Sequence, residues 1–251
     1  MERAEEVALW RAMLDLEDTV ERFVKASEDD HYYGAWIGGS ASSGGHPKGK
    51  PASGDQPYET RATGAALEIL GSSVTIQNRS NKQVQRHLRE LGDVPPGVLR
   101  TFVSGGGRIE ITDRPSSKLR LPGRPRGWSS ESTWGDVPGV FDPDSNLVFV
   151  GNTSPHGSTS LMLHELGHGM DNYAGIAKGE DWMSAWQKAS GTQAANPYYR
   201  QSDGAGASEM WAEAFAVQVK WGSPEVARTF GPEVASQVDS WMQDFRIRDA
   251  G

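Results

Sequence analysis

The feature that most constrains the fold of this chain is a pair of histidines, four residues apart, inside a run that reads as a helix. Residues 158–160 offer capping hydroxyls, residues 161–163 are apolar, and His164, Glu165 and His168 follow on the same segment. Side chains four apart lie one above the other on a helix, so both imidazoles can bind one cation while Glu165 faces its open side. Burying these polar groups without a cation would be costly. We therefore expect this helix to lie inside the molecule and to meet a further ligand from another segment.

The spacing H-E-x-x-H predicts a zinc site with a carboxylate beside the reacting water. Zinc lowers the pKa of its bound water to about 7, and Glu165 can take the proton as that water attacks a carbonyl. The chain has no cysteine, so disulfides and cysteine-type zinc fingers are excluded. We predict zinc as the cofactor, His164 and His168 as ligands and Glu165 as the catalytic base. An accidental polar helix face is the alternative.

A catalytic zinc takes three protein ligands and keeps one position open. A third histidine six residues after His168, as in a longer form of the motif, is excluded because that position is Ala174. Glu209 and Glu213 lie four apart in an apolar helical stretch, so their carboxylates share one face, which is either solvated or part of the metal site. Asp171 could bind the metal, hold a ligand histidine or stay in solvent, and we expect it to hold a histidine.

The chain divides into three parts. Apolar residues spaced alternately four and three apart predict an amphipathic helix within an N-terminal helical segment, residues 1–37. Docking of this helix onto the rest is favoured over a coiled coil because the apolar seam is short. Residues 38–57 are rich in Gly, Ser and Pro and predict a flexible linker. Residues 58–251 form the domain that carries the motif.

Periodicity within this domain predicts an α+β fold, with a small twisted sheet packed on helices. Residues 113–136 are rich in Pro, Gly, Ser and Trp and predict a long loop. A peptide can add itself to the edge of a small sheet, and residues 108–112 or 147–150 are the expected edge. The predicted strands are 74–76, 108–112, 140–141 and 147–150, and the predicted helices lie near 81–91, 98, 159–173, 181–189, 207–221 and 232–245.

The net charge is −8 and the pI is near 5.3. Nucleic acid as a partner is therefore not expected, because phosphate requires a basic surface. No apolar run is long enough to span a bilayer and the first residues lack a signal peptide pattern, so membrane insertion is not expected. The oligomeric state and the location stay open, as does whether the chain is a fragment of a longer protein.

Residues 164–175, HELGHGMDNYAG, followed by residues 209–215, EMWAEAF, resemble the catalytic domain of the anthrax lethal factor family, whose smaller relatives are the Pro-Pro endopeptidases. The resemblance implies a zincin-like fold and hydrolysis of peptide bonds in a protein or peptide substrate. It also implies that Glu209 is the third zinc ligand and that Glu213 lies behind the ligands. A toxin or delivered effector, or a secreted protease, is the biological role that the resemblance favours.

The resemblance further implies a tyrosine shortly before the third ligand, whose hydroxyl stabilises the developing oxyanion. Tyr198 and Tyr199 lie in the comparable place, although the gap to Glu209 is several residues longer than in the family. We choose Tyr198 as the catalytic tyrosine and Tyr199 as a substrate contact. Trp128 and Trp134 in the long loop are candidate walls of a substrate groove, since aromatic surfaces suit extended peptides. All four aromatic residues could instead be packing residues.

Two other functions stay open. The domain could be a non-catalytic module in which zinc only stabilises the fold and another surface binds a partner. The presence of Glu165 argues against this, and a zinc closed by four protein ligands would support it. The chain could also cleave only its own parent polypeptide. His87 lies in a polar segment without partners at ligand spacing and is assigned no role.

Overall fold

The computed structural model describes residues 61–113, 133, 137–151, 158–191, 197–202 and 204–247. The predicted N-terminal helical segment and linker lie outside the described residues, as do Trp128 and Trp134. The predictions for these parts stay predictions. None of the described helices is both long and apolar enough to cross a membrane.

The domain contains a four-stranded sheet in the order β1-β2-β4-β3. Strands β1 (Val74–Ile76), β2 (Arg108–Ile111) and β4 (Leu147–Val150) run parallel, and β3 (Gly139–Asp142) pairs antiparallel with β4, with Val140 opposite Phe149. A short turn joins β3 to β4 and contains Asn146 at φ 50, a left-handed conformation that asparagine tolerates. The strands predicted from the sequence are thus confirmed.

The edges of this sheet differ from the prediction. Both expected edge strands, β2 and β4, are hydrogen-bonded on two sides, and the outer strands are β1 and β3. The expectation was wrong because strand periodicity does not reveal the order in which strands pair. The unbroken apolar run of β4, Leu147–Val150, is typical of an inner parallel strand that is covered on both faces.

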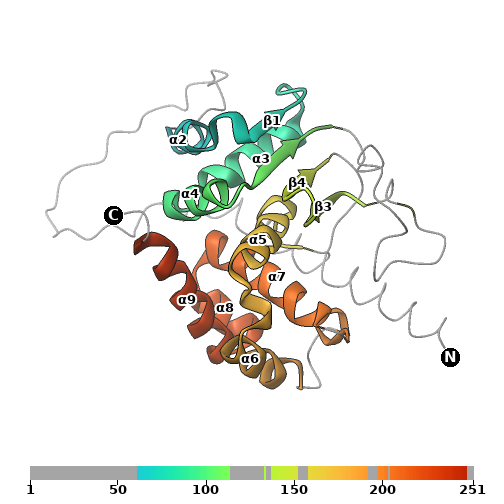
Figure 1. Ribbon diagram of the computed structural model, residues 1–251, viewed down its shortest axis with the longest axis vertical. Coiled ribbons are helices and arrows are strands. Elements are labelled where there is room, and N and C mark those ends of the chain that lie inside the picture. Colours follow the sequence, from blue (N-terminus) through green and yellow to red (C-terminus); the bar gives the residue numbers. More distant parts are fainter. Residues whose placement is uncertain are drawn as a thin grey trace, which may run out of the picture.

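Helices pack on this sheet and extend beyond it (Figure 1). In Figure 1, α5 lies between the sheet with α2–α4 on one side and α6–α9 on the other. The bounds are α2 Arg61–Leu70, α3 Lys82–Gly92, α4 Pro96–Ser104, α5 Leu161–Ala174, α6 Glu180–Ser190, α7 Ala205–Trp221, α8 Ser223–Phe230 and α9 Pro232–Ile247, with 3-10 turns η1 Gly71–Ser73, η4 Ile176–Lys178 and η5 Pro197–Arg200.

Local signals explain several of these helix ends. Asn81 caps α3 by accepting from the N–H groups of Gln83 and Val84, and Ser160 caps α5 by accepting from that of Leu163. Helix α5 ends at Gly175, whose φ of 67 favours glycine. Two short helices, α2 and α8, are not among those predicted from the sequence. Helix α8 follows Gly222, which provides no side-chain cap that would mark the helix start in the sequence.

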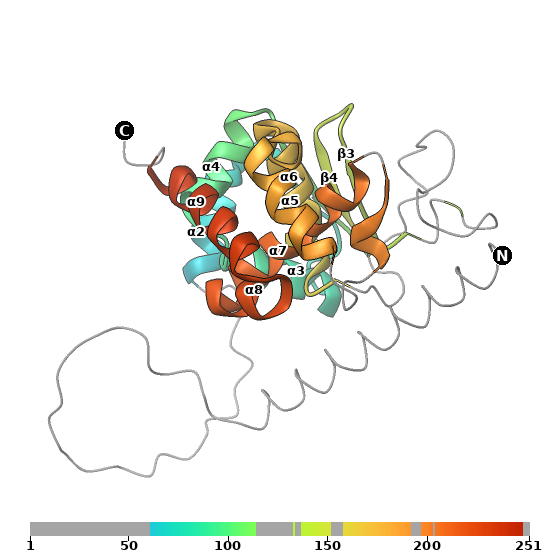
Figure 2. The same cartoon turned by 90° about the horizontal axis from the view of Figure 1, so that it is seen from below.

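Helices α5 and α7 lie side by side (Figures 1 and 2). A Cβ at Gly167 would lie 2.8 Å from Cα of Ala212, so glycine permits the close approach of the two backbones. The indole N–H of Trp211 donates to the carbonyl of Gly167 at 2.9 Å across this contact. Because α5 carries the histidine pair and α7 the glutamate pair, this packing brings the predicted ligands together.

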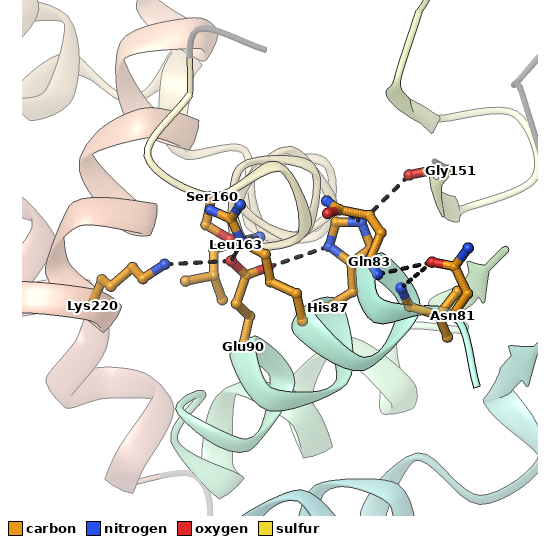
Figure 3. Close-up of polar contacts among 10 residues, drawn as sticks. Asn81, Gln83, His87, Glu90, Gly151, Ser160, Leu163 and Lys220 are labelled. Atoms are coloured by element: carbon orange, nitrogen blue, oxygen red, sulfur yellow. Dashed lines mark hydrogen bonds and ion pairs between the residues drawn. The ribbon is translucent and has the colours of Figure 1, made fainter. Parts of the chain in front are cut away.

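A buried polar cluster joins α3, α7 and the end of β4 (Figure 3). His87 and Glu90 are 1% and 4% exposed, and Nδ1 of His87 lies 3.3 Å from Oε2 of Glu90. Lys220 Nζ donates to Glu90 at 3.4 Å, and Nε2 of His87 lies 3.4 Å from the carbonyl oxygen of Gly151. His87, which received no role from the sequence, therefore links α3 to the end of β4, while Glu90 links α3 to α7.

Candidate active site

Helix α5 places the two histidines of the motif on one face. His164 and His168 have ring centroids 4.8 Å apart, and their Nε2 atoms lie 3.2 Å from each other. Both rings project toward α7, while the apolar side chains of Leu161 and Met162 are buried in the core. The spacing of the motif thus brings the two imidazoles together as predicted.

Helix α7 adds the third candidate ligand, Glu209. Its Oε2 atom lies 3.1 Å from Nε2 of His164 and 3.3 Å from Nε2 of His168. Tetrahedral zinc ligands at about 2.0–2.1 Å from the metal stand about 3.3 Å from one another. The three atoms therefore have the mutual spacing expected of three ligands on one tetrahedral cation. Within the described part of the chain, these residues form the one group suited to hold a metal.

Glu213, one turn after Glu209, lies behind the first histidine. Its Oε2 atom is 3.0 Å from Nδ1 of His164, and its Oε1 atom accepts the N–H of Thr159 at 2.7 Å. A carboxylate can only accept here, so Nδ1 of His164 carries a proton, and Nε2, which faces Glu209, is the nitrogen that would bind a metal in place of its own proton. Burial opposes ionisation of Glu213, but the hydrogen bonds from His164 and Thr159 outweigh it and lower its pKa.

The charges of this centre favour a divalent cation. The carboxylates of Glu165, Glu209 and Glu213 surround two imidazoles. Burial opposes ionisation of Glu209, but the charge and hydrogen bonds of the histidines hold its pKa well below the usual range. Burial also opposes a charge on His164, yet hydrogen bonds to Glu209 and Glu213 raise its pKa well above the usual value. The carboxylates thus require a compensating positive charge, which a bound metal supplies in place of the proton.

Glu165 lies between this centre and strand β3. It is 7% exposed, and burial raises the pKa of its carboxyl group, an effect that the charges of His164 and His168 oppose. The backbone N–H of Phe141 donates a hydrogen bond to this carboxylate. A Cβ at Gly139 would lie 3.2 Å from Cγ of Glu165, so glycine lets β3 approach the motif closely. A carboxylate whose pKa is raised toward neutral pH is suited to act as a general base.

The two candidate tyrosines have different surroundings. The hydroxyl of Tyr198 donates a hydrogen bond to Glu209, and burial together with the negative charge of Glu209 raises the pKa of Tyr198 well above its usual value. The ring of Tyr199 packs against Phe230 and Tyr198 at centroid distances of 5.6 and 5.9 Å. The structure therefore brings Tyr198 to the metal group and places Tyr199 in a packing contact. The substrate contact of Tyr199 stays a prediction.

Glycines accommodate the longer gap between the tyrosines and Glu209. Gly204 has φ 79 and precedes the first turn of α7, and a Cβ at Gly206 would lie 2.4 Å from the carbonyl oxygen of Tyr199. Only glycine therefore lets α7 begin directly against η5.

Asp171 does not contact the candidate ligands directly. Its Oδ2 atom accepts the hydroxyl of Ser208 at 2.9 Å, and Oγ of Ser208 lies 3.2 Å from Nδ1 of His168. Its Oδ1 atom accepts the N–H of Ala177 at 2.6 Å. Sequence reasoning missed Ser208, although its position directly before Glu209 was a signal that it lies near the metal group.

No curated protein matches the chain. A solved structure, that of the Pro-Pro endopeptidase PPEP-2 from Paenibacillus alvei, matches with a TM-score of 0.57 and 20% identity, over 69% of this chain and 99% of that one. This likeness confirms the expected α+β fold of the zincin type. The family model described as "Anthrax toxin lethal factor, N- and C-terminal domain" matches residues 72–222. Because that match covers more than half of the chain, from β1 to the end of α7, the chain belongs to the anthrax toxin lethal factor family.

Proposed function

We propose that this protein is a zinc-dependent endopeptidase with His164, His168 and Glu209 as metal ligands. The observation that carries the proposal is the triangle formed by the two Nε2 atoms and Oε2 of Glu209, with sides of 3.1, 3.2 and 3.3 Å. Family membership and the likeness to an endopeptidase support it. A buried carboxylate, Glu165, lies beside the two histidines, and such a group favours a catalytic zinc over a structural one.

When bound, zinc polarises the scissile carbonyl and lowers the pKa of water to about 7. Glu165 takes a proton from the attacking water and then delivers one to the leaving amine. The hydroxyl of Tyr198 keeps its proton, because burial and Glu209 raise its pKa well above the usual value, so it can donate to the developing oxyanion. Glu213 and Asp171 hold the ligand histidines, the first directly and the second through Ser208.

Strand β3 is the proposed binding edge for an extended peptide. The carbonyl of Pro138 accepts from the N–H of Gly151 on the β4 side, so alternation along the strand turns the backbone groups of Gly139 and the carbonyl of Phe141 away from β4, while the N–H of Phe141 donates to Glu165. This outer edge adjoins Glu165, and a peptide paired with it would pass the metal group. Trp128, Trp134 and Tyr199 remain proposed substrate contacts.

The test is cleavage of a peptide library, in which peptides containing Pro-Pro are one arm because of the name of the structural neighbour. We expect Glu165→Ala to retain zinc and lose cleavage, because the base is removed and the ligands stay. We expect Glu209→Ala to lose zinc, measured by metal analysis of the purified protein. Glu180→Ala, an exposed carboxylate on α6, is the matched control and should behave as wild type.

Other outcomes would identify the alternatives. A fully active Glu165→Ala would refute the mechanism. Wild type that binds zinc tightly but cleaves nothing would favour the non-catalytic binding module. Shortening of stored wild type, absent in Glu165→Ala, would favour a protease that acts on its own parent polypeptide. A role as a toxin, as a delivered effector or as a secreted protease rests on the family resemblance and needs a substrate from this screen.

A further inference from the structure

The two ligand histidines are supported in different ways. Nδ1 of His164 faces a carboxylate, that of Glu213, at 3.0 Å. Nδ1 of His168 faces a neutral hydroxyl, that of Ser208, at 3.2 Å. A carboxylate can only accept, whereas a hydroxyl can either donate or accept. The surroundings of Ser208 therefore decide which ring nitrogen of His168 carries the proton.

Asp171 decides this direction. The hydroxyl of Ser208 donates its single proton to Oδ2 of Asp171 at 2.9 Å, so toward His168 its oxygen can only accept. Nδ1 of His168 must then be the protonated nitrogen, which leaves the Nε2 lone pair for the metal. Asp171 is itself oriented by the N–H of Ala177, which donates to its other oxygen at 2.6 Å.

We propose that Ser208 is a positioning residue for His168. Because Ser208 donates its proton to Asp171, it accepts a hydrogen bond from Nδ1 of His168, and this sets the tautomer and orientation of the second metal ligand. The inference deepens the proposed function, since it concerns the same zinc site. It also explains how Asp171 can support a ligand histidine that it does not touch.

The relay predicts a specific effect of Asp171→Asn. The N–H of Ala177 requires an acceptor, so the amide oxygen of the asparagine would face Ala177 and its NH₂ group would face Ser208. Ser208 would then accept that hydrogen bond and donate toward Nδ1 of His168. This reversal favours the tautomer with a proton on Nε2, which cannot bind a metal.

The first experiment measures zinc affinity by competition with a chelator. We expect Ser208→Ala to bind zinc about tenfold more weakly than wild type, since the loss of a group that supports a ligand histidine costs 10- to 100-fold. Ser208→Thr keeps the hydroxyl and should restore most of the affinity. Ser184→Ala removes an exposed serine from α6 and should bind as wild type does. The unfolding midpoint of each zinc-free variant separates a weaker site from a weaker fold.

The second experiment is a double-mutant cycle. Asp171→Asn alone should weaken zinc binding at least as much as Ser208→Ala. In the Ser208→Ala background the same change should alter the affinity less than about twofold, because the link to His168 is already gone. Effects of the two changes that multiply would overturn the relay, as would a Ser208→Ala protein that binds zinc within about twofold of wild type.

These results are distinguishable from failure of the proposed function. If wild type takes up no zinc, the metal site itself is wrong. If wild type binds zinc and Ser208→Ala binds it equally well, only the relay is wrong. Should Ser208→Ala fail to fold, Asp171→Asn decides alone: weaker zinc binding with an unchanged zinc-free midpoint supports the relay, and unchanged binding overturns it.

Discussion

At the residue scale, the site depends on where protons lie. Glu213 and Ser208 accept from Nδ1 of His164 and His168, so both Nε2 atoms can face a metal. Tyr198, in contrast, acts as a hydrogen-bond donor, so its hydroxyl must stay protonated. Burial and the charge of Glu209 raise its pKa, which holds the hydroxyl in that state.

Replacing Tyr198 by Phe removes this donor and leaves the ligands in place. We expect Tyr198→Phe to retain zinc and to lower kcat by about 10²- to 10³-fold with little change in KM, because the donor acts mainly in the transition state. Tyr173→Phe is the matched control, since Tyr173 is exposed near the end of α5 and has no role in the proposed site. Steady-state kinetics on one peptide substrate measures both. Equal losses in the two variants would mean that Tyr198 has no special role.

At the element scale, the centre depends on how closely α5, α7, η5 and β3 approach one another. Glycines stand at the contacts: Gly167 between α5 and α7, Gly139 between β3 and α5, and Gly206 between α7 and η5. The sequence shows where these glycines are, but it does not show which atom of another helix or strand each one contacts. The sequence likewise shows the longer gap between Tyr198 and Glu209, but it does not show that the two side chains meet.

Gly206→Ala tests the contact between α7 and η5. The added Cβ would lie 2.4 Å from a backbone oxygen that cannot rotate away, so we expect η5 to shift and cleavage to fall at least tenfold. Zinc should still bind, because the three ligands lie outside this contact. Gly64→Ala in α2 is the control, since its Cβ would meet nothing within 4 Å, and it should stabilise the fold by up to about 1 kcal/mol. Activity, zinc content and urea unfolding together measure the effects.

At the scale of the whole molecule, the buried cluster of His87, Glu90 and Lys220 joins α3 to α7, two helices that lie far apart in the sequence. Burial opposes ionisation of Glu90, but the hydrogen bond from His87 and the charges of Lys220 and Arg86 outweigh it and lower the pKa of Glu90 from 4.5 to about 2. A carboxyl group with a depressed pKa in the folded state stabilises the fold above its unfolded pKa. That stability is lost as the pH falls from about 4.5 toward 2.

Glu90→Gln should therefore lower the free energy of unfolding at pH 7 by up to about 3 kcal/mol. The difference from wild type should shrink as the pH falls below about 4.5, because wild type then loses the same charge. Urea unfolding at a series of pH values measures it. Glu225→Gln removes a surface pair with Arg228 and should change the stability by less than about 1 kcal/mol. A Glu90→Gln deficit that does not vary with pH would contradict this account.

The sequence by itself determined the features that depend on residues near one another in the chain. The spacing of His164, Glu165 and His168 predicted one helix face, and the capping hydroxyls expected at residues 158–160 include Ser160, which caps α5. The four strands and most helices followed from periodicity in the same way. Glu209 was placed by the resemblance, and the packing of α5 on α7 brings it to the histidines.

Only the tertiary structure decided which distant segments meet. Three features depend on contacts between segments that are distant in the sequence. They are the outer position of β3, the hydrogen bonds of Ser208, and the contact between Glu90 and Lys220, which are 130 positions apart. The periodicity of apolar residues indicates whether a residue faces the core, but it does not indicate which residue it contacts there. Each partner is selected by the packing of the whole domain, because a buried polar group is stable only where the fold supplies its hydrogen bond.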